Sequence, residues 1–290
     1  MTAPCPRLPT YPGDTPGFVP CAGPVPDPLP EGSCCLVVAQ GDRFVCDPDG
    51  AVVLPASCLG ALPLDTVHRL GTLDGQEVFV AGLGGPNRAV PDPWTTAGLR
   101  DLVMTQTPTT WAAAALASQV VHWDRTTRFC GLCGTPMAQP DLAHRAKVCP
   151  GCGHTVWPRI SPCVITLVYD DAGRVLLGRK AEWPAGRYGL LAGFVEPGES
   201  LEDAVRRECL EETGIAVTDV EYRGSQPWPF PHQLMVGFWA RAEGTEVTAG
   251  DGELEDARWF SRDALPRLPP RLSIARSLID AWFDREDARS

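Results

Sequence analysis

Three glutamates in the C-terminal half of the chain are spaced so that they can act together. Glu208, Glu211 and Glu212 lie three and four residues apart in a segment, 201–213, that is predicted to be helical. At about 100° per residue, the side they share overlaps the apolar stripe of the first helical turns. Carboxylates buried there without a counter-charge would cost several kcal/mol. A divalent cation such as Mg²⁺ or Mn²⁺ prefers oxygen ligands, and such ions usually act on phosphates.

The residues around these glutamates bound the helix and add one cation. Ser200 can cap the helix, with Asp203 three residues later, and Gly214 can end it. Arg207 can pair with Glu211 at i, i+4, but one guanidinium does not neutralise three carboxylates. Taken alone, such a trio is usually a solvated acidic face, and the helix by itself leaves this alternative open.

A second set of residues has the spacing of a metal site. Cys130, Cys133, Cys149 and Cys152 form two C-x₂-C pairs separated by fifteen residues. Each pair can supply two corners of a tetrahedron, and nearby glycines allow the tight turns that this requires. Four protein sulfurs leave no open position, so we expect one structural zinc ion per chain. His144 lies nearby but outside this spacing and is expected at the surface.

The composition excludes several classes of protein. The chain has 290 residues, 44% of them apolar, and a net charge of −11, which disfavours non-specific binding to nucleic acid or an anionic membrane. No apolar stretch approaches the ~18 residues of a membrane helix, and no secretory signal is apparent. Without such a signal, the six cysteines before residue 60 are expected to be reduced, and the protein to be cytoplasmic.

The order of the predicted elements suggests several parts. Ten of the 30 prolines precede residue 31, so 1–31 is expected to be mostly disordered. Short β-branched runs at 35–39, 43–46, 51–54 and 77–81, with turns between them, predict a small antiparallel module. A helix is expected at about 109–123, capped by Thr109 or Thr110. From residue 161, strands are predicted at 163–169, 174–179, 188–195, 217–223, 234–242 and 257–260, and a last helix at 272–283.

The glutamate helix, with its flanking residues, resembles the Nudix hydrolases. Their pattern G-x₅-E-x₇-R-E-U-x-E-E-x-G-U, with U apolar, is matched at every fixed position, by Gly193, Glu199, Arg207, Glu208, Glu211, Glu212 and Gly214. That family cleaves nucleoside diphosphates linked to another group, by water attack on phosphorus with divalent metals. The resemblance implies an α+β fold: an α/β/α sandwich with a mixed sheet at 159–290, preceded by a zinc ribbon at 126–158 and a small β-rich domain with a linker helix at 32–125.

A second motif is similar to one subgroup of that family. Ser225-Gln-Pro-Trp-Pro-Phe-Pro231 is the marker of the bacterial NADH pyrophosphatases, which also carry a four-cysteine ribbon upstream. Core aromatics at the start of a strand are the plainer interpretation of its rings. The marker normally continues to a Ser where this chain has Gln233, and Trp157 stands where the family commonly has Tyr. Both differences keep a polar and an aromatic side chain.

The resemblance assigns roles to residues. Glu208 and Glu212 would be metal ligands, Glu211 a further ligand or the group that activates water, and Glu253 an additional ligand. The Ala192 carbonyl would face a metal, and Arg207 and Glu199 complete the catalytic set. The implied substrate-binding residues are Arg100, Trp157, Phe194, Gln226, Pro227, Trp228, Pro229, Phe230, Pro231, His232, Gln233 and Ala275.

The implied reaction is hydrolysis of the pyrophosphate of NADH or NAD⁺ to AMP and nicotinamide mononucleotide, with Mg²⁺ or Mn²⁺ as the catalytic metal. The family also removes NAD caps from RNA 5′ ends, and its members are homodimers. Two alternatives remain at this stage. One is a pyrophosphatase of ADP-ribose or another dinucleotide. The other is a zinc-ribbon binding or regulatory protein with an inactive Nudix domain, although such a protein would not need a repulsive carboxylate trio.

Overall fold

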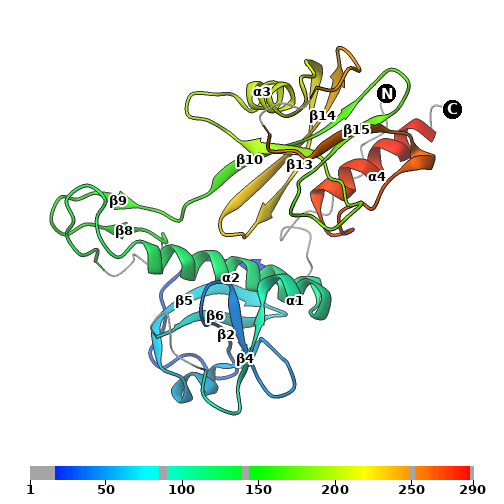
Figure 1. Ribbon diagram of the computed structural model, residues 1–290. Helices are drawn as coiled ribbons and strands as arrows, with labels where there is room; N and C mark the ends of the chain where they lie inside the picture. The colour runs from blue at the N-terminus through cyan, green and yellow to red at the C-terminus, as the bar shows by residue number, and fades with distance from the viewer. Residues whose placement is uncertain (1–16, 85–89, 139–143, 249–251, 288–290) are drawn as a thin grey trace. The chain divides into compact units, whose positions relative to one another are not determined.

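The computed structural model describes residues 17–84, 90–138, 144–248 and 252–287 (Figure 1). Their contacts divide the chain into two compact units, which we name after one helix of each. The α3 unit contains 161–228 and the described residues from 233 onward, with helix α3 at Leu201–Thr213. The α2 unit contains the described residues up to 160 together with 229–232, with helix α2 at Pro108–Thr126.

A mixed sheet forms the centre of the α3 unit. Its strand order is β13-β14-β10-β11-β15, and β12 also pairs with β10. β10 and β14 are parallel, whereas the other pairs are antiparallel. The strands are β10 (Ser161–Tyr169), β11 (Val175–Arg179), β12 (Leu191–Phe194), β13 (Val217–Trp228), β14 (Gln233–Ala242) and β15 (Asp256–Phe260).

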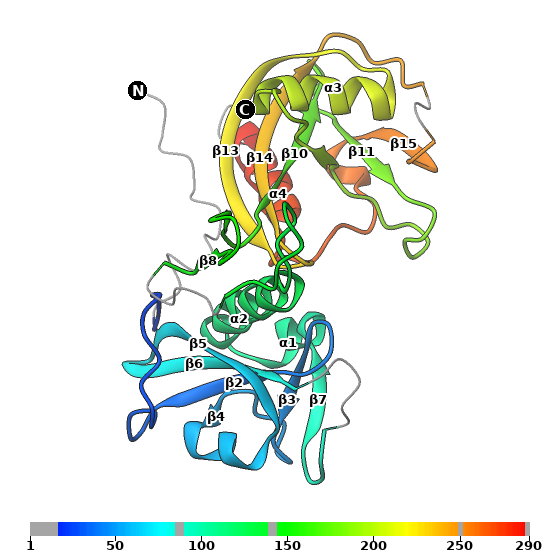
Figure 2. The ribbon, with the colours of Figure 1, turned by 90° about the vertical axis from the view of Figure 1, so that its left-hand side faces the viewer.

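The central strand β10 feeds two cores because its side chains alternate between the faces of the sheet. Val164 and Val168 pack in one cluster with Val205 of α3, and Ile165 and Leu167 pack in another that includes helix α4 (Ile274–Asp287). The two helices therefore cover opposite faces of the sheet (Figure 2). This is the expected α/β/α sandwich with a mixed sheet.

The elements predicted for this unit are present. Helix α3 has the predicted bounds, and each expected strand overlaps an observed one. Strand β13 extends five residues beyond the prediction, through Trp228, and β12 is shorter than the predicted 188–195, since 188–190 and 195 lie outside it. Between β15 and α4 lies the short 3₁₀ helix η2 (Arg262–Ala264).

The α2 unit contains a second sheet, of order β1-β5-β6-β2-β3-β7, with β4 paired to β2. The strands are β1 (Phe18–Pro20), β2 (Cys34–Val38), β3 (Arg43–Cys46), β4 (Leu54–Pro55), β5 (Leu64–Leu73), β6 (Gln76–Leu83) and β7 (Thr95–Gly98). The 3₁₀ helix η1 (Ala56–Ala61) follows β4, and α1 (Leu99–Thr105) follows β7.

Both faces of this second sheet are covered. All five residues of β2 are buried, as expected for a strand that faces a core on each side. Leu36 and Val38 pack towards the alanine-rich helix α2, and Cys35 and Val37 pack into a separate cluster on the other face. The ribbon that follows α2 adds a two-stranded sheet, β8 (Lys147–Val148) and β9 (Thr155–Val156).

Three predictions for the α2 unit need correction. The sheet is not purely antiparallel, since β2 and β6 run parallel. The segment expected to be disordered includes β1, which pairs with β5 and buries Phe18; the prediction for residues 1–16 lies outside the described residues. The cap of α2 is Thr107, whose hydroxyl accepts from the Thr110 amide, with Pro108 in the first turn. A proline at that position loses no helical hydrogen bond.

Within the described ranges, no helix combines the length and the apolar character needed to cross a membrane.

Candidate catalytic site and zinc site

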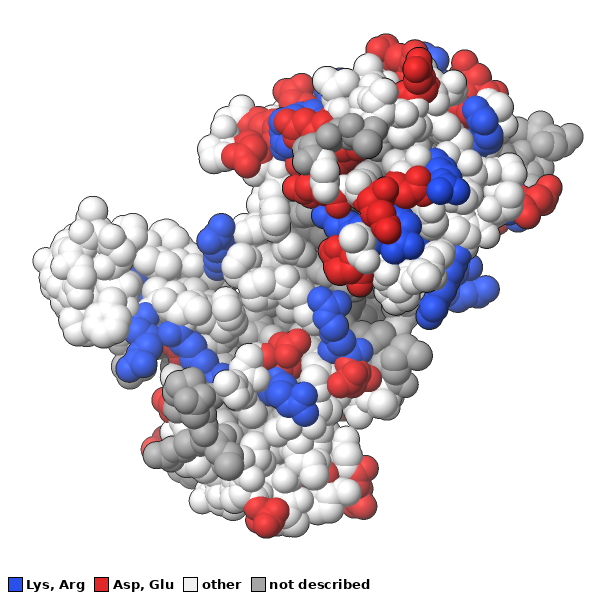
Figure 3. All heavy atoms as spheres, in the orientation of Figure 1, with Lys and Arg blue, Asp and Glu red and all other residues white. Residues whose placement is uncertain are grey.

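Local sequence fixes the ends of helix α3. The Ser200 hydroxyl accepts a hydrogen bond from the Asp203 amide at 3.1 Å, which satisfies a free donor of the first turn. At the other end Gly214 has φ +71°, a left-handed conformation in which glycine is not strained. Acidic side chains gather over this helix on the surface (Figure 3).

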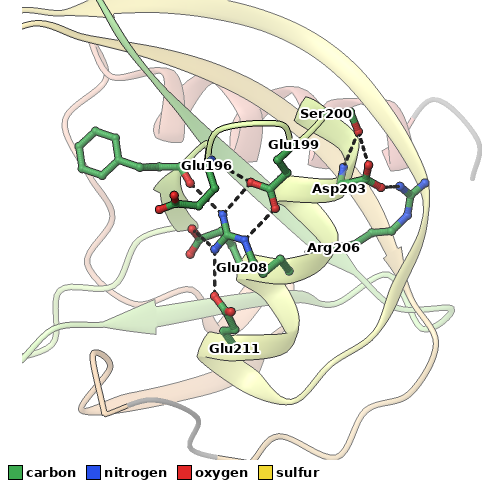
Figure 4. Close-up of polar contacts among 9 residues, drawn as sticks. Glu196, Glu199, Ser200, Asp203, Arg206, Glu208 and Glu211 are labelled. Carbon is green, nitrogen blue, oxygen red and sulfur yellow. Dashed lines mark hydrogen bonds and ion pairs between the residues drawn. The ribbon is translucent and has the colours of Figure 1, made fainter.

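Arg207 hydrogen-bonds to carboxylates on α3 and just before it, and Figure 4 labels these acids as Glu199, Glu208 and Glu211. Its guanidinium donates to both oxygens of Glu199, at 2.8 and 2.9 Å. It also donates to Glu208 at 2.8 Å, to Glu211 at 2.9 Å and to the Phe194 carbonyl at 2.9 Å. One cation therefore serves three carboxylates.

The three helical glutamates differ in depth. Glu212 is 3% exposed, the side chain of Glu208 is 15% exposed, and that of Glu211 is 49% exposed. The predicted shared side is thus a gradient from core to solvent, because steps of three and four residues turn by different angles. A site built on these residues would open at Glu211 and deepen towards Glu212.

Burial and ion pairing move the pKa values of these carboxyls in opposite directions. The Arg207 guanidinium lowers the pKa of Glu199 to about 2. Burial raises the pKa of Glu208, and its hydrogen bond from Arg207 offsets this only in part. The same guanidinium therefore stabilises one negative charge well and the deeper one poorly.

The backbone of β12 approaches the Glu208 carboxyl closely. A Cβ added at Gly193 would lie 1.9 Å from the carboxyl carbon of Glu208, so any larger residue would displace this carboxylate. Ala192, the preceding residue, is paired with Ile165 of β10. The Nudix glycine thus makes room for a carboxylate beside the backbone of the strand that carries the Ala192 carbonyl.

Glu253, the other predicted metal ligand, makes an ion pair with Lys180 at 3.1 Å. Burial alone would lower the pKa of this lysine, but Glu253 raises it above its ordinary value. Lys180 follows the end of β11 and belongs to no motif, so sequence reasoning missed it. A basic residue directly after a buried strand was the only available signal.

The carboxylates of this site lie near one another, but their oxygens do not converge on one point. In the described part of the chain, only the four cysteines bring three or more possible ligand atoms within 4.8 Å of one another. The carboxylates nevertheless suit a hard divalent cation chemically, since they offer oxygens in excess of positive charge beside a backbone strand.

The marker segment forms the end of β13 and the hairpin that joins it to β14, where Trp228 is paired with Gln233. Gln226 is buried, and its amide is fully engaged: Nε2 donates to the Leu272 carbonyl at 2.9 Å, and Oε1 accepts from the Ile274 amide at 2.8 Å. This residue therefore holds the start of α4.

The other predicted substrate residues are divided between the two units. Trp228 is half-buried against the cluster that contains Ala275. Phe194 keeps half of its surface exposed. In the α2 unit, the Arg100 guanidinium lies 4.0 Å from the centroid of the Phe230 ring, and Trp157 is 60% exposed. The hairpin also contains Pro227, Pro229, Pro231 and His232.

The four ribbon cysteines have the geometry of a tetrahedral site. The Sγ–Sγ separations are 3.7 Å for Cys130 and Cys152 and 3.5 Å for Cys133 and Cys149. Zinc–sulfur bonds of about 2.3 Å would give edges of about 3.8 Å. Of the ribbon glycines, Gly134 and Gly153 have a positive φ, near +75°, whereas Gly131 and Gly151 do not. The donor set and its spacing fit structural zinc.

Arg145 and Lys147, the two basic residues inside the ribbon, face the protein rather than solvent. The Arg145 guanidinium donates to the carbonyls of Cys21, Arg69 and Leu70, and burial lowers its pKa. His144, by contrast, is exposed. Neither feature makes the ribbon a basic surface, and Arg145 ties it to the sheet of the α2 unit.

Lys147 joins a buried ion cluster that the sequence did not suggest. Its ammonium pairs with the Asp124 carboxylate and donates to the carbonyls of Asp124, at 2.8 Å, and Thr127, at 3.0 Å. The other Asp124 oxygen lies 3.1 Å from Nε2 of His68. Burial alone would raise the pKa of Asp124, but His68 and Lys147 together lower it to about 2. All three side chains are buried, so this cluster fastens β5, α2 and the ribbon.

Comparison with known proteins first defines the class. The sequence model of the NUDIX domain matches residues 159–283. The NADH pyrophosphatase zinc ribbon domain matches 125–156, and the NADH pyrophosphatase-like rudimentary NUDIX domain matches 32–123. Among solved structures, a NUDIX hydrolase from Nitrosomonas europaea is 24% identical with a TM-score of 0.48, covering 55% of this chain and 93% of that one.

Full-length relatives then give the family. The NAD-capped RNA hydrolase NudC of Pseudomonas fluorescens is 42% identical over 251 residues, 86% of this chain and 89% of the relative. The protein of the same name from Stutzerimonas stutzeri is 40% identical over 91% of this chain and 94% of its own. The chain therefore belongs to the zinc-ribbon NADH pyrophosphatase family of the Nudix hydrolases.

Proposed function

We propose that the protein hydrolyses the pyrophosphate bond of NADH and NAD⁺, giving AMP and nicotinamide mononucleotide, and that it removes NAD caps from RNA 5′ ends by the same reaction. The observation that carries this proposal is the excess of carboxylate on α3 and just before it, where one guanidinium serves Glu199, Glu208 and Glu211 while Glu212 is buried beside them. The proposal is supported by relatives named NAD-capped RNA hydrolase over most of the chain.

In this proposal the carboxylates hold Mg²⁺ or Mn²⁺. Glu208, Glu212 and the Ala192 carbonyl are the metal ligands, Glu211 is a further ligand or orients the attacking water, and Glu253 adds a ligand from the loop before β15. The metal, when bound, neutralises charge that develops on the pyrophosphate and lowers the pKa of a water molecule.

Arg207 and Glu199 act as positioning residues. The two hydrogen bonds between them fix the guanidinium, which in turn orients Glu208 and Glu211. A bidentate pair has a defined plane, so it restricts the guanidinium more than a single contact would. The ligand carboxylates are therefore oriented before the substrate arrives.

The substrate-binding proposal uses the rings and the hairpin. Phe194 and Trp157 present exposed faces on which a planar base can stack. Gln226 acts indirectly, by fixing the chain beside Ala275. The remaining proposed contacts come from Arg100 and from residues of the hairpin, Pro227, Trp228, Pro229, Phe230, Pro231, His232 and Gln233.

We further propose a cytoplasmic homodimer. Large apolar side chains of the ribbon and of the segment that joins it to β10, Leu132 and Ile160, are 74% and 63% exposed and would be covered by a second copy. Free cysteines, several of them buried, suit a reducing compartment. Light scattering coupled to size exclusion tests the dimer, and a monomeric mass at micromolar concentration would contradict it.

The function is tested by product analysis. The protein is incubated with NADH, NAD⁺, ADP-ribose and NAD-capped RNA, each in Mg²⁺ and in Mn²⁺, and the products are separated by chromatography. AMP with nicotinamide mononucleotide from NADH, and a 5′-monophosphate RNA from the capped RNA, support the proposal. Faster hydrolysis of ADP-ribose than of NADH would favour the broader dinucleotide activity. If none of the four substrates is hydrolysed in either metal, the proposed activity is wrong, and a binding role is favoured.

A further inference from the structure

Most basic side chains of the α3 unit are neutralised by a neighbouring acid. Ten have a carboxylate oxygen within 4.0 Å: Arg174, Arg179, Lys180, Arg206, Arg207, Arg223, Arg241, Arg258, Arg276 and Arg285. Three arginines differ. Among the described residues, Arg187, Arg267 and Arg271 have no carboxylate partner. In a chain of net charge −11, uncompensated positive charge is the exception.

These three arginines lie in segments that are joined by the backbone. The Arg267 amide donates to the Gly186 carbonyl at 3.1 Å, and the Tyr188 amide donates to the Arg267 carbonyl at 3.0 Å. Arg187 and Arg267 are therefore parallel partners. Arg271 is four residues further along, at most about 14 Å from Arg267 in an extended chain.

The segment that carries two of the arginines is stiff and exposed. Pro266, Pro269 and Pro270 restrict its backbone, so the points from which the arginine side chains extend vary little. Arg267 and Arg271 are exposed, and Arg187 is half-exposed with its guanidinium 5.8 Å from the centroid of a tryptophan ring.

The same segment is anchored to the marker strand. Leu272, directly after Arg271, accepts the hydrogen bond from the Gln226 amide, and Ile274 donates to the same side chain. The arginines therefore begin one residue from the contact that ties α4 to the proposed nucleotide site. A nucleotide held near Ala275 would therefore lie only a few residues along the chain from Arg271.

We propose that Arg187, Arg267 and Arg271 form a track that binds the phosphates of the RNA chain beyond the NAD cap, an inference that rests on the proposed function. The guanidinium fork matches a phosphate with two parallel hydrogen bonds. Because no described carboxylate lies within 4.0 Å of them, these groups need not break an ion pair to bind. The track gives an acidic protein a local attraction for a polyanion, and free NADH does not use it.

The first experiment compares two triple variants with the same change in charge. R187Q/R267Q/R271Q removes the track, and R206Q/R241Q/R258Q removes three arginines of the same unit that are paired with acids. We measure kcat/KM for NADH and for an NAD-capped single-stranded RNA between about 50 and about 200 mM salt. For NADH, both variants should stay within about twofold of the unmodified protein, since neither alters a residue of the proposed catalytic set.

For the capped RNA, the track variant should lose about tenfold or more in kcat/KM, mostly through KM, and the control should lose little. The slope of log kcat/KM against log salt should become shallower by about 2 in the track variant, because three lost phosphate contacts on a single strand contribute about 0.7 each. Equal rates and equal slopes for the two variants would overturn the track.

A binding measurement separates this inference from the proposed function. Fluorescence anisotropy of a labelled, uncapped single-stranded RNA needs neither metal nor hydrolysis. The track variant should bind this RNA at least several-fold more weakly than the control variant, whether or not the protein cleaves NADH. If NADH and capped RNA are not hydrolysed but the two variants still differ in RNA affinity, the proposed function is wrong and the track is supported. If hydrolysis is normal and the two variants bind equally, the track fails alone.

Discussion

Two ion clusters among the described residues, one on α2 and one on α3, are built on opposite principles. In the α2 unit, one carboxylate, Asp124, pairs with a lysine and a histidine. The lysine also donates hydrogen bonds to two backbone carbonyls. In the α3 unit, one guanidinium, Arg207, is shared by three carboxylates while Glu212 is buried beside them. The first cluster is balanced in charge, and the second is not.

This difference separates a structural role from a catalytic one. A balanced cluster satisfies its own charges, and its contribution is to hold elements together. A cluster with surplus negative charge is costly in isolation, and it is stabilised when a cation arrives. Changes to the first should therefore affect stability, and changes to the second should affect turnover.

The largest expected effect is on turnover and comes from the unbalanced cluster. Glu212→Gln keeps the size of the side chain but removes one negative charge, and we expect kcat to fall by about 10²–10³-fold. Thermal unfolding should change little. Glu202→Gln, on the exposed first turn of the same helix, is the matched control and should retain full activity. Near-normal turnover of the Glu212 variant would place this glutamate outside the mechanism.

The balanced cluster should show the opposite behaviour. Lys147→Met leaves the Asp124 carboxylate buried without its main counter-charge, so the free energy of unfolding should fall by about 3–5 kcal/mol. Adding Asp124→Asn should recover part of that loss, because it removes the buried charge as well. Urea unfolding at saturating zinc measures both. Lys180→Met, which breaks an exposed pair, should cost less than about 1 kcal/mol. Equal losses of unfolding free energy in the Lys147 and Lys180 variants would contradict the proposed difference between the two clusters.

Acid should weaken the balanced cluster in a defined pH window. Because the pKa of Asp124 is lowered in the folded protein to about 2, from about 3.9 when unfolded, its charge stabilises the fold fully above pH 4. That contribution, of order 2 kcal/mol, is lost as the pH falls from about 4 to about 2. Comparison with Asp124→Asn at each pH cancels the loss of zinc, which is common to both proteins. The stability gap should narrow on acidification, and a constant gap would show that the charge is not responsible.

The smallest of these effects tests the geometry of the unbalanced cluster. Gly193→Ala would bring a methyl group within 1.9 Å of the Glu208 carboxyl carbon, so this carboxylate must move. We expect turnover to fall by about tenfold and the Mn²⁺ affinity to weaken, with little change in unfolding. Gly244→Ala, where an added Cβ meets nothing within 4 Å, is the control. Unchanged Mn²⁺ affinity and turnover would mean that Glu208 need not lie against β12.

The α3 unit was predictable from the sequence to a large extent because its signals are local. Ser200 and Gly214 mark the ends of α3 by cap chemistry, and the spacing of the glutamates places them on one side. The sequence could not predict how deeply each of these glutamates is buried. The difference in exposure between Glu211 and Glu212 depends on the sheet beneath the helix, which no local pattern describes.

The α2 unit was less predictable because its contacts join distant segments. The parallel pairing of β2 with β6 connects residues more than 40 positions apart. Lys147 and Arg145 look like surface residues in the ribbon, yet partners on β5 and α2 bury Lys147 and largely enclose Arg145. Thr107, and not Thr109 or Thr110, caps α2, because the helix begins one residue earlier than predicted, at Pro108, and a proline in the first turn loses no helical hydrogen bond.

The strand β1 has a practical consequence for anyone who shortens this protein. A recombinant version that starts at residue 32, where the proline-rich beginning ends, would remove the edge partner of β5 and leave an empty space where Phe18 packs. Bare edges of this kind recruit other chains. Truncated material would be prone to precipitate during purification, and versions made for crystallisation should keep at least residue 17.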